Sequence, residues 1–231
     1  MKIIKNEKLI KRNSKIGQYT SLGALVVLGV GMYISFTRPD LFVWAVAALL
    51  GGFTLTQIGM YFGNRWGRSP RPDERLDAGL KGLPGDFVMY HWTTPVAHLL
   101  VGPAGIWVLI PYHQRGRVTY QKNRWRMSGG GFLQNYMRLF GQEGIGRPDL
   151  EAEAEINSLR KALAKDMEED EIPEIKAALV FTTEGVEIDV EDAPMPALPI
   201  KKLKDFMRNK AKEKPITVSE IERVKASLPD Q

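Results

Sequence analysis

The chain has 231 residues, 44% of them hydrophobic, which is enough for one sizeable folded domain and a smaller one. Its net charge of +5 comes from the first sixteen residues, because the sequence from Asn64 onward is neutral. This neutrality argues against bulk binding of a phosphate backbone. The lack of cysteine leaves no disulfide framework and no thiol nucleophile, and is consistent with a reducing compartment.

Residues 1–16 form a basic tail with regularly spaced cations. Basic side chains alternate there with four aliphatic ones, and their positions are Lys2, Lys5, Lys8, Lys11, Arg12 and Lys15. This spacing predicts a helix that lies on a membrane surface and is attracted to anionic headgroups. The same charges are also explained if they only fix the orientation of the first span in the membrane. The charges alone do not decide whether the tail contacts lipid or protein.

Two apolar runs follow the tail, at residues 17–36 and 41–62. Each run extends for about 20 residues without a charge, which is enough to cross a bilayer core of about 30 Å. The four residues between them include Pro39, which cannot continue a helix, so a tight reversal is predicted. Residues 17–63 therefore read as a transmembrane helical hairpin. A soluble hairpin would need a large partner core, and a signal peptide would not be followed at once by a second span.

The glycines of these runs suit close contact between helices. Gly59 and Gly63 have the small-xxx-small spacing, which fits either packing of the two spans on each other or a dimerisation motif. Basic residues flank both ends of the hairpin, in the tail and at Arg65, Arg68 and Arg71. The positive-inside rule then predicts an integral cytoplasmic membrane protein with two spans and both termini cytoplasmic.

Residues 64–72 read as a linker that contains Gly67, Pro70 and Pro72, and residues 73–214 read as a folded domain. A short helix is expected from Asp73 to about residue 82. The following runs are rich in valine, isoleucine, leucine and aromatic residues, and predict strands at 86–92, 96–101 and 106–110. The last two runs are almost wholly apolar, as in central strands that are covered on both faces.

The remaining elements are predicted from the same patterns. They are a strand hairpin at 117–121 and 124–127, an amphipathic segment at 132–140, a long helix at 149–169, strands at 177–183, 186–190 and 197–200, a basic helix at 201–212, and a final helix within 215–231. Thr217 and Glu220 have the spacing of a capping box for that final helix. The order of elements indicates an α/β sandwich with a mixed sheet.

A local basic cluster accompanies the strand hairpin. Its members are Arg115, Arg117, Lys122, Arg124 and Arg126, with Trp125 and Tyr120 between them. Cations beside aromatic rings can hold a phosphate backbone and stack bases, so the cluster is a candidate nucleic-acid-binding surface. A solvated hairpin face with no ligand explains the same pattern.

Several connected motifs occur in one order along the domain. The letters DERL stand at 73–76, LPGDFV at 83–88 and HLLVGPAGIWVL at 98–109, followed by GRV at 116–118. Arg147-Pro148 precedes the long helix, and an apolar strand follows it. On these motifs, residues 70–210 resemble the nuclease-related domain (NERD) family. The resemblance implies a restriction-endonuclease-like α/β fold with a mixed sheet, attached to the transmembrane hairpin.

The resemblance also locates the catalytic positions of that family. Active members carry an aspartate before the histidine of the core motif, and a glutamate and a lysine at the end of the next strand. Here these places hold Ala97, Ile110 and Tyr112. An alanine or isoleucine side chain offers no oxygen ligand to a hard cation such as Mg²⁺, and tyrosine is not a cation at neutral pH. The fold is therefore expected to persist without metal-assisted cleavage.

Other catalytic arrangements have little support in the sequence. Glu74 is the one acidic residue still at a family position, and the three histidines are His91, His98 and His113. The surroundings of His113 near Asp73 or Glu74 would be the place to seek a substitute site, but no metal site and no cofactor are predicted. Phosphate loops and serine elbows have no match.

The sequence thus predicts a membrane-anchored, catalytically inactive NERD-like domain that acts as an interaction or scaffold module. Its expected partners are the lipid bilayer and another protein. A membrane-tethered nucleic-acid-binding module is the first alternative, and an active metal-dependent nuclease with displaced ligands is the second. The partner, the process and the oligomeric state do not follow from the sequence.

Overall fold

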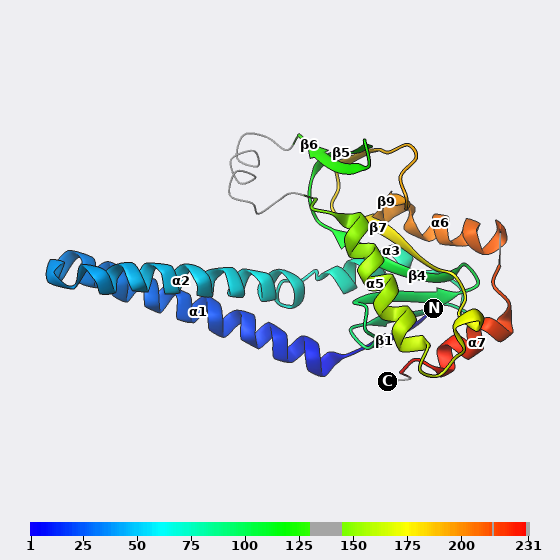
Figure 1. The fold of residues 1–231 in the computed structure, drawn as a ribbon, viewed down its shortest axis with the longest axis horizontal. Coiled ribbons are helices and arrows are strands. Elements are labelled where there is room, and N and C mark those ends of the chain that lie inside the picture. Colours follow the sequence, from blue (N-terminus) through cyan, green and yellow to red (C-terminus); the bar gives the residue numbers. More distant parts are fainter. Residues whose placement is uncertain (130–144, 214, 230–231) are drawn as a thin grey trace. The chain divides into compact units, whose positions relative to one another are not determined.

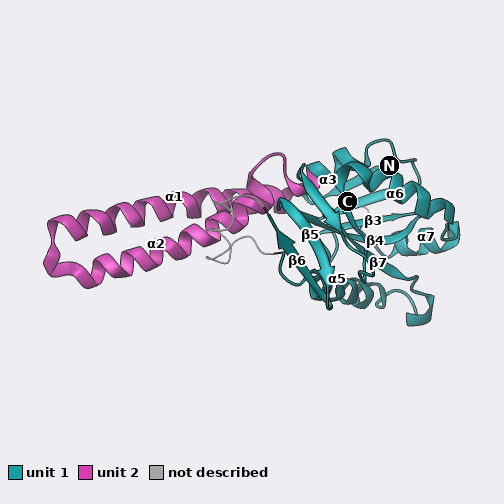
Figure 2. Ribbon diagram, turned by 90° about the horizontal axis from the view of Figure 1, so that it is seen from above, with its two compact units in different colours: residues 1–6, 75–231 teal, residues 7–74 magenta. Residues whose placement is uncertain are grey.

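A computed structural model of the chain describes residues 1–129, 145–213 and 215–229. The amphipathic segment predicted at 132–140 lies outside the described residues. The chain divides into two compact units, which Figure 2 shows in different colours. One unit comprises residues 7–74 and is called the hairpin unit. The other comprises residues 1–6 and 75–231 and is called the α/β unit.

The elements follow one another in the order drawn in Figure 1. They are β1 (Lys2–Lys5), α1 (Glu7–Thr37), η1 (Pro39–Leu41), α2 (Phe42–Phe62), η2 (Gly63–Gly67), α3 (Pro72–Leu80), β2 (Val88–His91), β3 (His98–Gly102), β4 (Gly105–Tyr112), β5 (Gly116–Gln121), β6 (Arg124–Ser128), α5 (Pro148–Leu163), η3 (Glu169–Glu171), β7 (Ile175–Phe181), β8 (Val186–Asp189), β9 (Ala197–Pro199), α6 (Ile200–Glu213) and α7 (Val218–Ala226).

The hairpin unit consists of two long apolar helices joined by a short turn. Pro39 stands at the start of the turn η1, where its fixed φ suits a new helical segment. Both helices are long and apolar enough to cross a membrane, judged by length and composition. Only 11% of each apolar window is buried, unlike the core helix of a soluble protein. The predicted pair of spans is therefore present as two helices.

Small residues bring the two helices of the hairpin unit close together. A Cβ atom added at Gly59 of α2 would lie 2.4 Å from the Ser21 Oγ of α1, and one added at Gly31 would lie 2.8 Å from the Ala48 Cβ. Gly59 thus contacts the other helix of the same chain. Of the two interpretations of its spacing, the structure supports packing of one span on the other.

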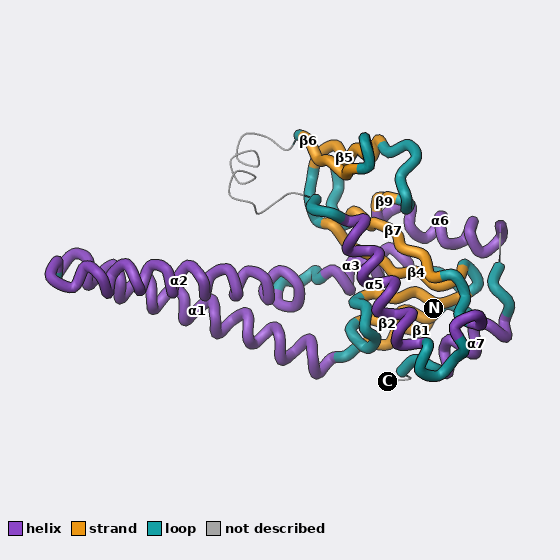
Figure 3. The backbone as a smooth tube through the Cα atoms, in the orientation of Figure 1, coloured by secondary structure: helices purple, strands orange, loops and turns teal. Residues whose placement is uncertain are grey.

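The α/β unit is built on a mixed sheet of six strands. Their order is β1-β2-β3-β4-β7-β9, and a smaller sheet has the order β6-β5-β8. In the large sheet, β2, β3 and β4 form an antiparallel meander, whereas β1 pairs parallel to β2 and both β7 and β9 continue parallel from β4. Figure 3 shows these strands as the orange centre of the unit. The predicted mixed sheet is confirmed.

Two apolar layers cover the large sheet, one on each face. One layer contains side chains of α5, α7 and the small sheet, with Leu159 and Val224 among them. The other contains side chains of α3 and α6, with Leu80 and Leu203 among them. Residues along β4 alternate between the layers, so Val108 and Ile110 face α5 while Leu109 faces α3. The unit is thus a helix–sheet–helix sandwich.

The amino-terminal tail differs from its prediction as a surface-lying helix. Residues 2–5 form strand β1, whose residues Ile3 and Ile4 pair with Met89 and Tyr90 of β2. Ile4 is buried in the core of the α/β unit, and Lys2 remains exposed. Two adjacent β-branched residues favour a strand, and pairing with β2 satisfies their backbone groups. The helix α1 begins only at Glu7.

The predicted elements of the α/β unit are present, with changed ends. The long helix α5 stops at Leu163 rather than near residue 169. The four acidic residues at 168–171 would oppose the negative end of a longer helix and repel one another. The capping box of α7 is formed, because the Thr217 hydroxyl accepts from the Glu220 backbone and the Glu220 carboxylate accepts from the Thr217 backbone.

Candidate functional site

The positions that correspond to the cleavage residues of the resembled family lie at the end of β4 and the start of β3. Ile110 and Tyr112 are 4% and 8% exposed and belong to the apolar layer beneath α5. Ala97 is half-buried and precedes β3 directly, where its carbonyl accepts a hydrogen bond from the Trp92 backbone. The side chains at 97 and 110 carry no polar atom, so neither can bind an ion.

Tyr112 is held by a carboxylate of the helix that covers it. Its hydroxyl donates to Glu151 Oε2 over 2.8 Å. Burial raises the pKa of Tyr112, and the hydrogen bond and charge of Glu151 raise it further, with Glu155 and Asp149 adding to the effect. Tyr112 is therefore a neutral donor that ties β4 to α5, and it does not supply the cation expected of a lysine there.

Carboxylates near this strand end do not form a metal site. Asp149 binds Arg147 over 2.9 Å, so its charge is already compensated. Within residues 1–129, 145–213 and 215–229, no three histidine, aspartate or glutamate side chains come together in an arrangement that could hold a metal ion. At the end of β4, the described side chains thus form a hydrogen bond between Tyr112 and Glu151 and no set of metal ligands.

A buried polar network lies on the opposite face of the sheet. His91 and His98 face each other across the antiparallel pair β2–β3, and both are almost completely buried. Their Nδ1 atoms are 2.8 Å apart, and His91 Nε2 is 3.0 Å from Asp77 Oδ1 of α3. The other oxygen of Asp77 forms an ion pair with Lys5 of β1. The network thus links α3 to the three strands β1, β2 and β3.

The carboxylate of Asp77 decides which nitrogen of His91 carries a proton. Burial would raise the pKa of Asp77, but hydrogen bonds and charges from His91 and Lys5 outweigh it, and the pKa is lowered. An ionised carboxylate only accepts, so His91 Nε2 carries a proton and donates to Asp77. Of the two facing Nδ1 atoms, one donates to the other, and the tautomers of the rings set the direction. The chain of bonds orders both imidazoles.

The sequence indicated His113, and not His91 or His98, as the place to seek a substitute site. His113 is exposed, and its carbonyl accepts from the Thr183 hydroxyl. Asp73 and Glu74 both bind Arg71 within the hairpin unit. The network of Asp77 and Lys5 was missed. The register of the predicted strands 86–92 and 96–101 was the available signal, since it sets His91 opposite His98.

The basic cluster beside the small sheet differs from a base-stacking surface. Trp125 is buried at 5% exposure and packs against Tyr120, with ring centroids 5.1 Å apart. Trp125 belongs to the core, because alternate residues of a strand point to opposite faces. Its ring is therefore not on the exposed face that the cations share. The cations that accompany it are exposed, and they are Arg115, Arg117, Lys122, Arg124 and Arg126.

Acidic residues of β8 share the exposed face of the small sheet. Arg117 forms an ion pair with Asp189, and Glu187 lies opposite Arg117 in the strand register. The sharp turn at Lys122 and Asn123 is present as predicted, with both residues at positive φ. The face is thus of mixed charge, which matches a solvated surface better than a continuous phosphate track.

The chain was compared with known families, curated proteins and solved structures. No family model, no curated protein and no solved structure matches the chain.

Proposed function

We propose that this protein is a membrane-anchored NERD-like domain without cleavage activity, which serves as an interaction module at the cytoplasmic face of the membrane. The observation that best supports this proposal is the burial of Ile110 and Tyr112. Both side chains are packed in the layer under α5, where a nuclease of this type would need a metal-binding carboxylate and a cation. The polar group that remains there, the Tyr112 hydroxyl, binds Glu151.

The topology of the chain supports anchoring by a hairpin. Strand β1 belongs to the large sheet, the chain then passes through α1 and α2, and it returns to the same unit at residue 75. Both ends of the hairpin are thus continuous with one folded unit, and this continuity supports the proposal that they lie on one side of a bilayer. Exposed cations on the first turns of α1, namely Lys8, Lys11, Arg12 and Lys15, favour the cytoplasmic side.

The lack of native cysteine makes this topology directly testable. Asp40→Cys in the turn between the helices is expected to react with a membrane-impermeant maleimide in intact cells. Lys202→Cys on α6 is the matched control, since Lys202 is also exposed. It is expected to react only after the cells are permeabilised. Labelling of both positions in intact cells would contradict a cytoplasmic α/β unit.

The proposed loss of cleavage activity is tested with the full chain in an uncharged detergent. Labelled DNA incubated with the protein and Mg²⁺ or Mn²⁺ is expected to stay intact, because the side chains of Ala97 and Ile110 offer no oxygen ligand to a metal ion. Cleavage that disappears in Glu74→Ala and persists in Glu153→Ala would overturn the proposal. Glu153 is the control because it is an exposed carboxylate of α5.

Nucleic-acid binding is the competing function, and the exposed Arg124 and Arg126 are the observation in its favour. Binding of the same labelled DNA to the full chain measures this function. Binding without cleavage that weakens steeply with salt and is lost in Arg124→Ala/Arg126→Ala would favour a nucleic-acid-binding module over a protein-interaction module.

A further inference from the structure

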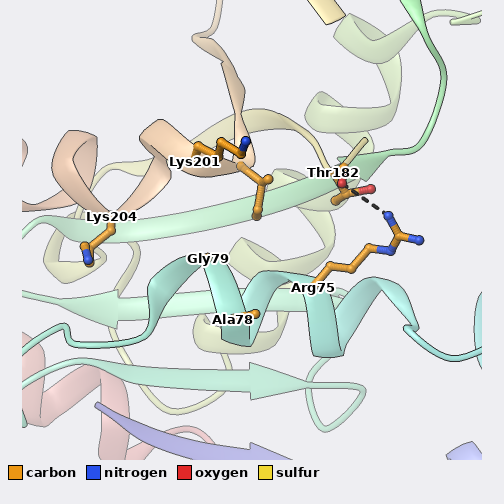
Figure 4. A pocket seen from close by; sticks show the side chains of 7 residues that line it. Arg75, Ala78, Gly79, Thr182, Lys201 and Lys204 are labelled. Atoms are coloured by element: carbon orange, nitrogen blue, oxygen red, sulfur yellow. Dashed lines mark hydrogen bonds between the residues drawn. The ribbon is translucent and has the colours of Figure 1, made fainter. Parts of the chain in front are cut away.

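A pocket opens between α3 and the beginning of α6 in the α/β unit. Its volume is about 420 Å³, and its walls include Arg75, Gly79, Thr182, Ile200, Lys201 and Lys204 (Figure 4). Pockets of small-molecule ligands begin at about 300 Å³, so this one can hold a metabolite of modest size. It lies on the face of the sheet opposite to Ile110 and Tyr112.

The walls of the pocket carry one sign of charge. Arg75 comes from α3, and Lys201 and Lys204 come from α6, whereas no carboxylate is among the described residues that line it. Arg75 Nη1 donates to the Thr182 carbonyl over 3.2 Å, which holds the guanidinium at one end of the pocket. Figure 4 shows this bond and the two lysines on the neighbouring helix.

One compensating charge, Glu184, is not among the residues that line the pocket. Glu184 pairs with Lys201 over 2.7 Å, but both side chains are largely solvent-exposed, at 81% and 75%. Such an exposed pair is weak, and a ligand anion can compete for the lysine. Lys204 is half-buried. The described residues that line the pocket thus include three cations and no carboxylate.

Close packing of α3 on α6 fixes the shape of the pocket. A Cβ atom at Gly79 would lie 2.6 Å from the Ile200 Cδ1 and 3.3 Å from the Ile200 carbonyl oxygen, so a glycine at this position favours the close approach of the two segments. Ile200 and Ala78 add an apolar surface beside the cations. Thr182 directly follows β7, and β9 leads straight into α6. The carboxyl ends of two parallel strands therefore meet at the pocket, the usual place for ligands in open α/β sheets.

We infer that this pocket binds a small molecule that carries a phosphate group. Three cationic side chains match a doubly charged phosphate better than a single carboxylate, because two or more charge-assisted hydrogen bonds can form at once. The phosphate alone would fill a small part of the volume, and the apolar surface of Ile200 and Ala78 suits the organic part of the ligand. The first turn of α6 adds to the positive potential.

The inference is tested by calorimetric titration of the full chain in an uncharged detergent. Adenosine 5′-monophosphate, inorganic phosphate and adenosine are the probes. The two phosphates are expected to bind and adenosine to bind much more weakly. In Lys201→Ala/Lys204→Ala, the affinity for the nucleotide is expected to fall by about tenfold or more, since two charged contacts are lost. Lys202→Ala is the control on the same helix, because Lys202 does not line the pocket.

The outcomes separate the possible sources of the phosphate. Binding of a short-chain phosphatidic acid in place of the nucleotide, with the same loss in the double variant, assigns the phosphate to a lipid headgroup. Failure of every phosphate probe to bind overturns the inference. Equal weakening by Lys202→Ala also overturns it, because it would reflect diffuse surface charge. An unchanged unfolding temperature of the double variant excludes loss of the fold as the cause.

Discussion

Replacing Ile110 by glutamate is expected to unfold the α/β unit rather than rebuild a metal site. Ile110 is 4% exposed in β4, between β3 and β7, within the apolar layer under α5. A carboxylate there would lose its hydration without gaining a cation, which costs about 4 kcal/mol or more. Thermal unfolding of the full chain in detergent, followed by tryptophan fluorescence, measures the effect.

The control for this substitution makes the side chain smaller and keeps it apolar. Ile110→Val removes one methylene group and is expected to cost only about 0.5–1.5 kcal/mol. If Ile110→Glu instead stayed folded and cleaved DNA in the presence of Mg²⁺, alone or with Tyr112→Lys, the strand end would have room for a metal ion. The proposal that the cleavage centre is closed by packing would then fail.

Removal of the Asp77 carboxylate is expected to have the second-largest effect. Asp77→Ala removes the ion pair between Lys5 and Asp77 and the hydrogen bond between His91 Nε2 and Asp77, and the side chains of Lys5 and His91 are mostly buried. Loss of one partner from a buried pair typically costs about 3 kcal/mol or more. For a chain of this size, the unfolding temperature should fall by about 6–12 °C. The same unfolding assay reports it.

An exposed ion pair supplies the matched control. Glu174→Ala removes a carboxylate that is 71% exposed and pairs with Lys176. Its cost is expected to stay below about 1 kcal/mol, because water screens such pairs. The double variant Lys5→Met/Asp77→Ala should lose less than the sum of its single variants. A strictly additive result would indicate that Lys5 and Asp77 do not stabilise each other.

The effect of Asp77 depends on pH in a defined direction. Because the pKa of Asp77 is lowered in the folded chain, its carboxylate stabilises the fold above the ordinary aspartate value of about 3.9. This stabilisation is lost as the pH falls through the folded pKa. The difference in stability between the wild type and Asp77→Ala should therefore be constant near neutral pH and shrink below about pH 4. A difference that grew in acid would contradict the assigned ion pair.

The position of Asp77 connects this network to the hairpin along the chain. Lys5 stands two residues before α1, and Asp77 follows the residues of the hairpin unit by three positions. The ion pair therefore joins the two points where the chain leaves the α/β unit for the hairpin unit and returns from it. A weakened pair is expected to loosen β1 first, because β1 is an edge strand with a single neighbour.

Local signals in the sequence were sufficient for much of the architecture. Two uncharged runs around Pro39 predicted the helical hairpin, and Thr217 with Glu220 predicted the capped helix α7. The apolar runs before and after Gly102–Gly105 predicted β3 and β4. These features depend on residues close together in the chain, whose backbone preferences and hydrogen bonds are set by their neighbours.

Contacts between distant residues decided the rest. Ile3 and Ile4 became a strand because β2 offered a partner more than eighty positions away, and Trp125 turned inward because the small sheet covers the core. The network of Asp77, His91 and His98 depends on how α3 lies on the sheet, which no local pattern encodes. The sequence by itself therefore determined the two apolar helices and most helices and strands of the α/β unit, but not strand β1. Only the tertiary structure decided which side chains meet, because those contacts arise when whole elements pair and pack.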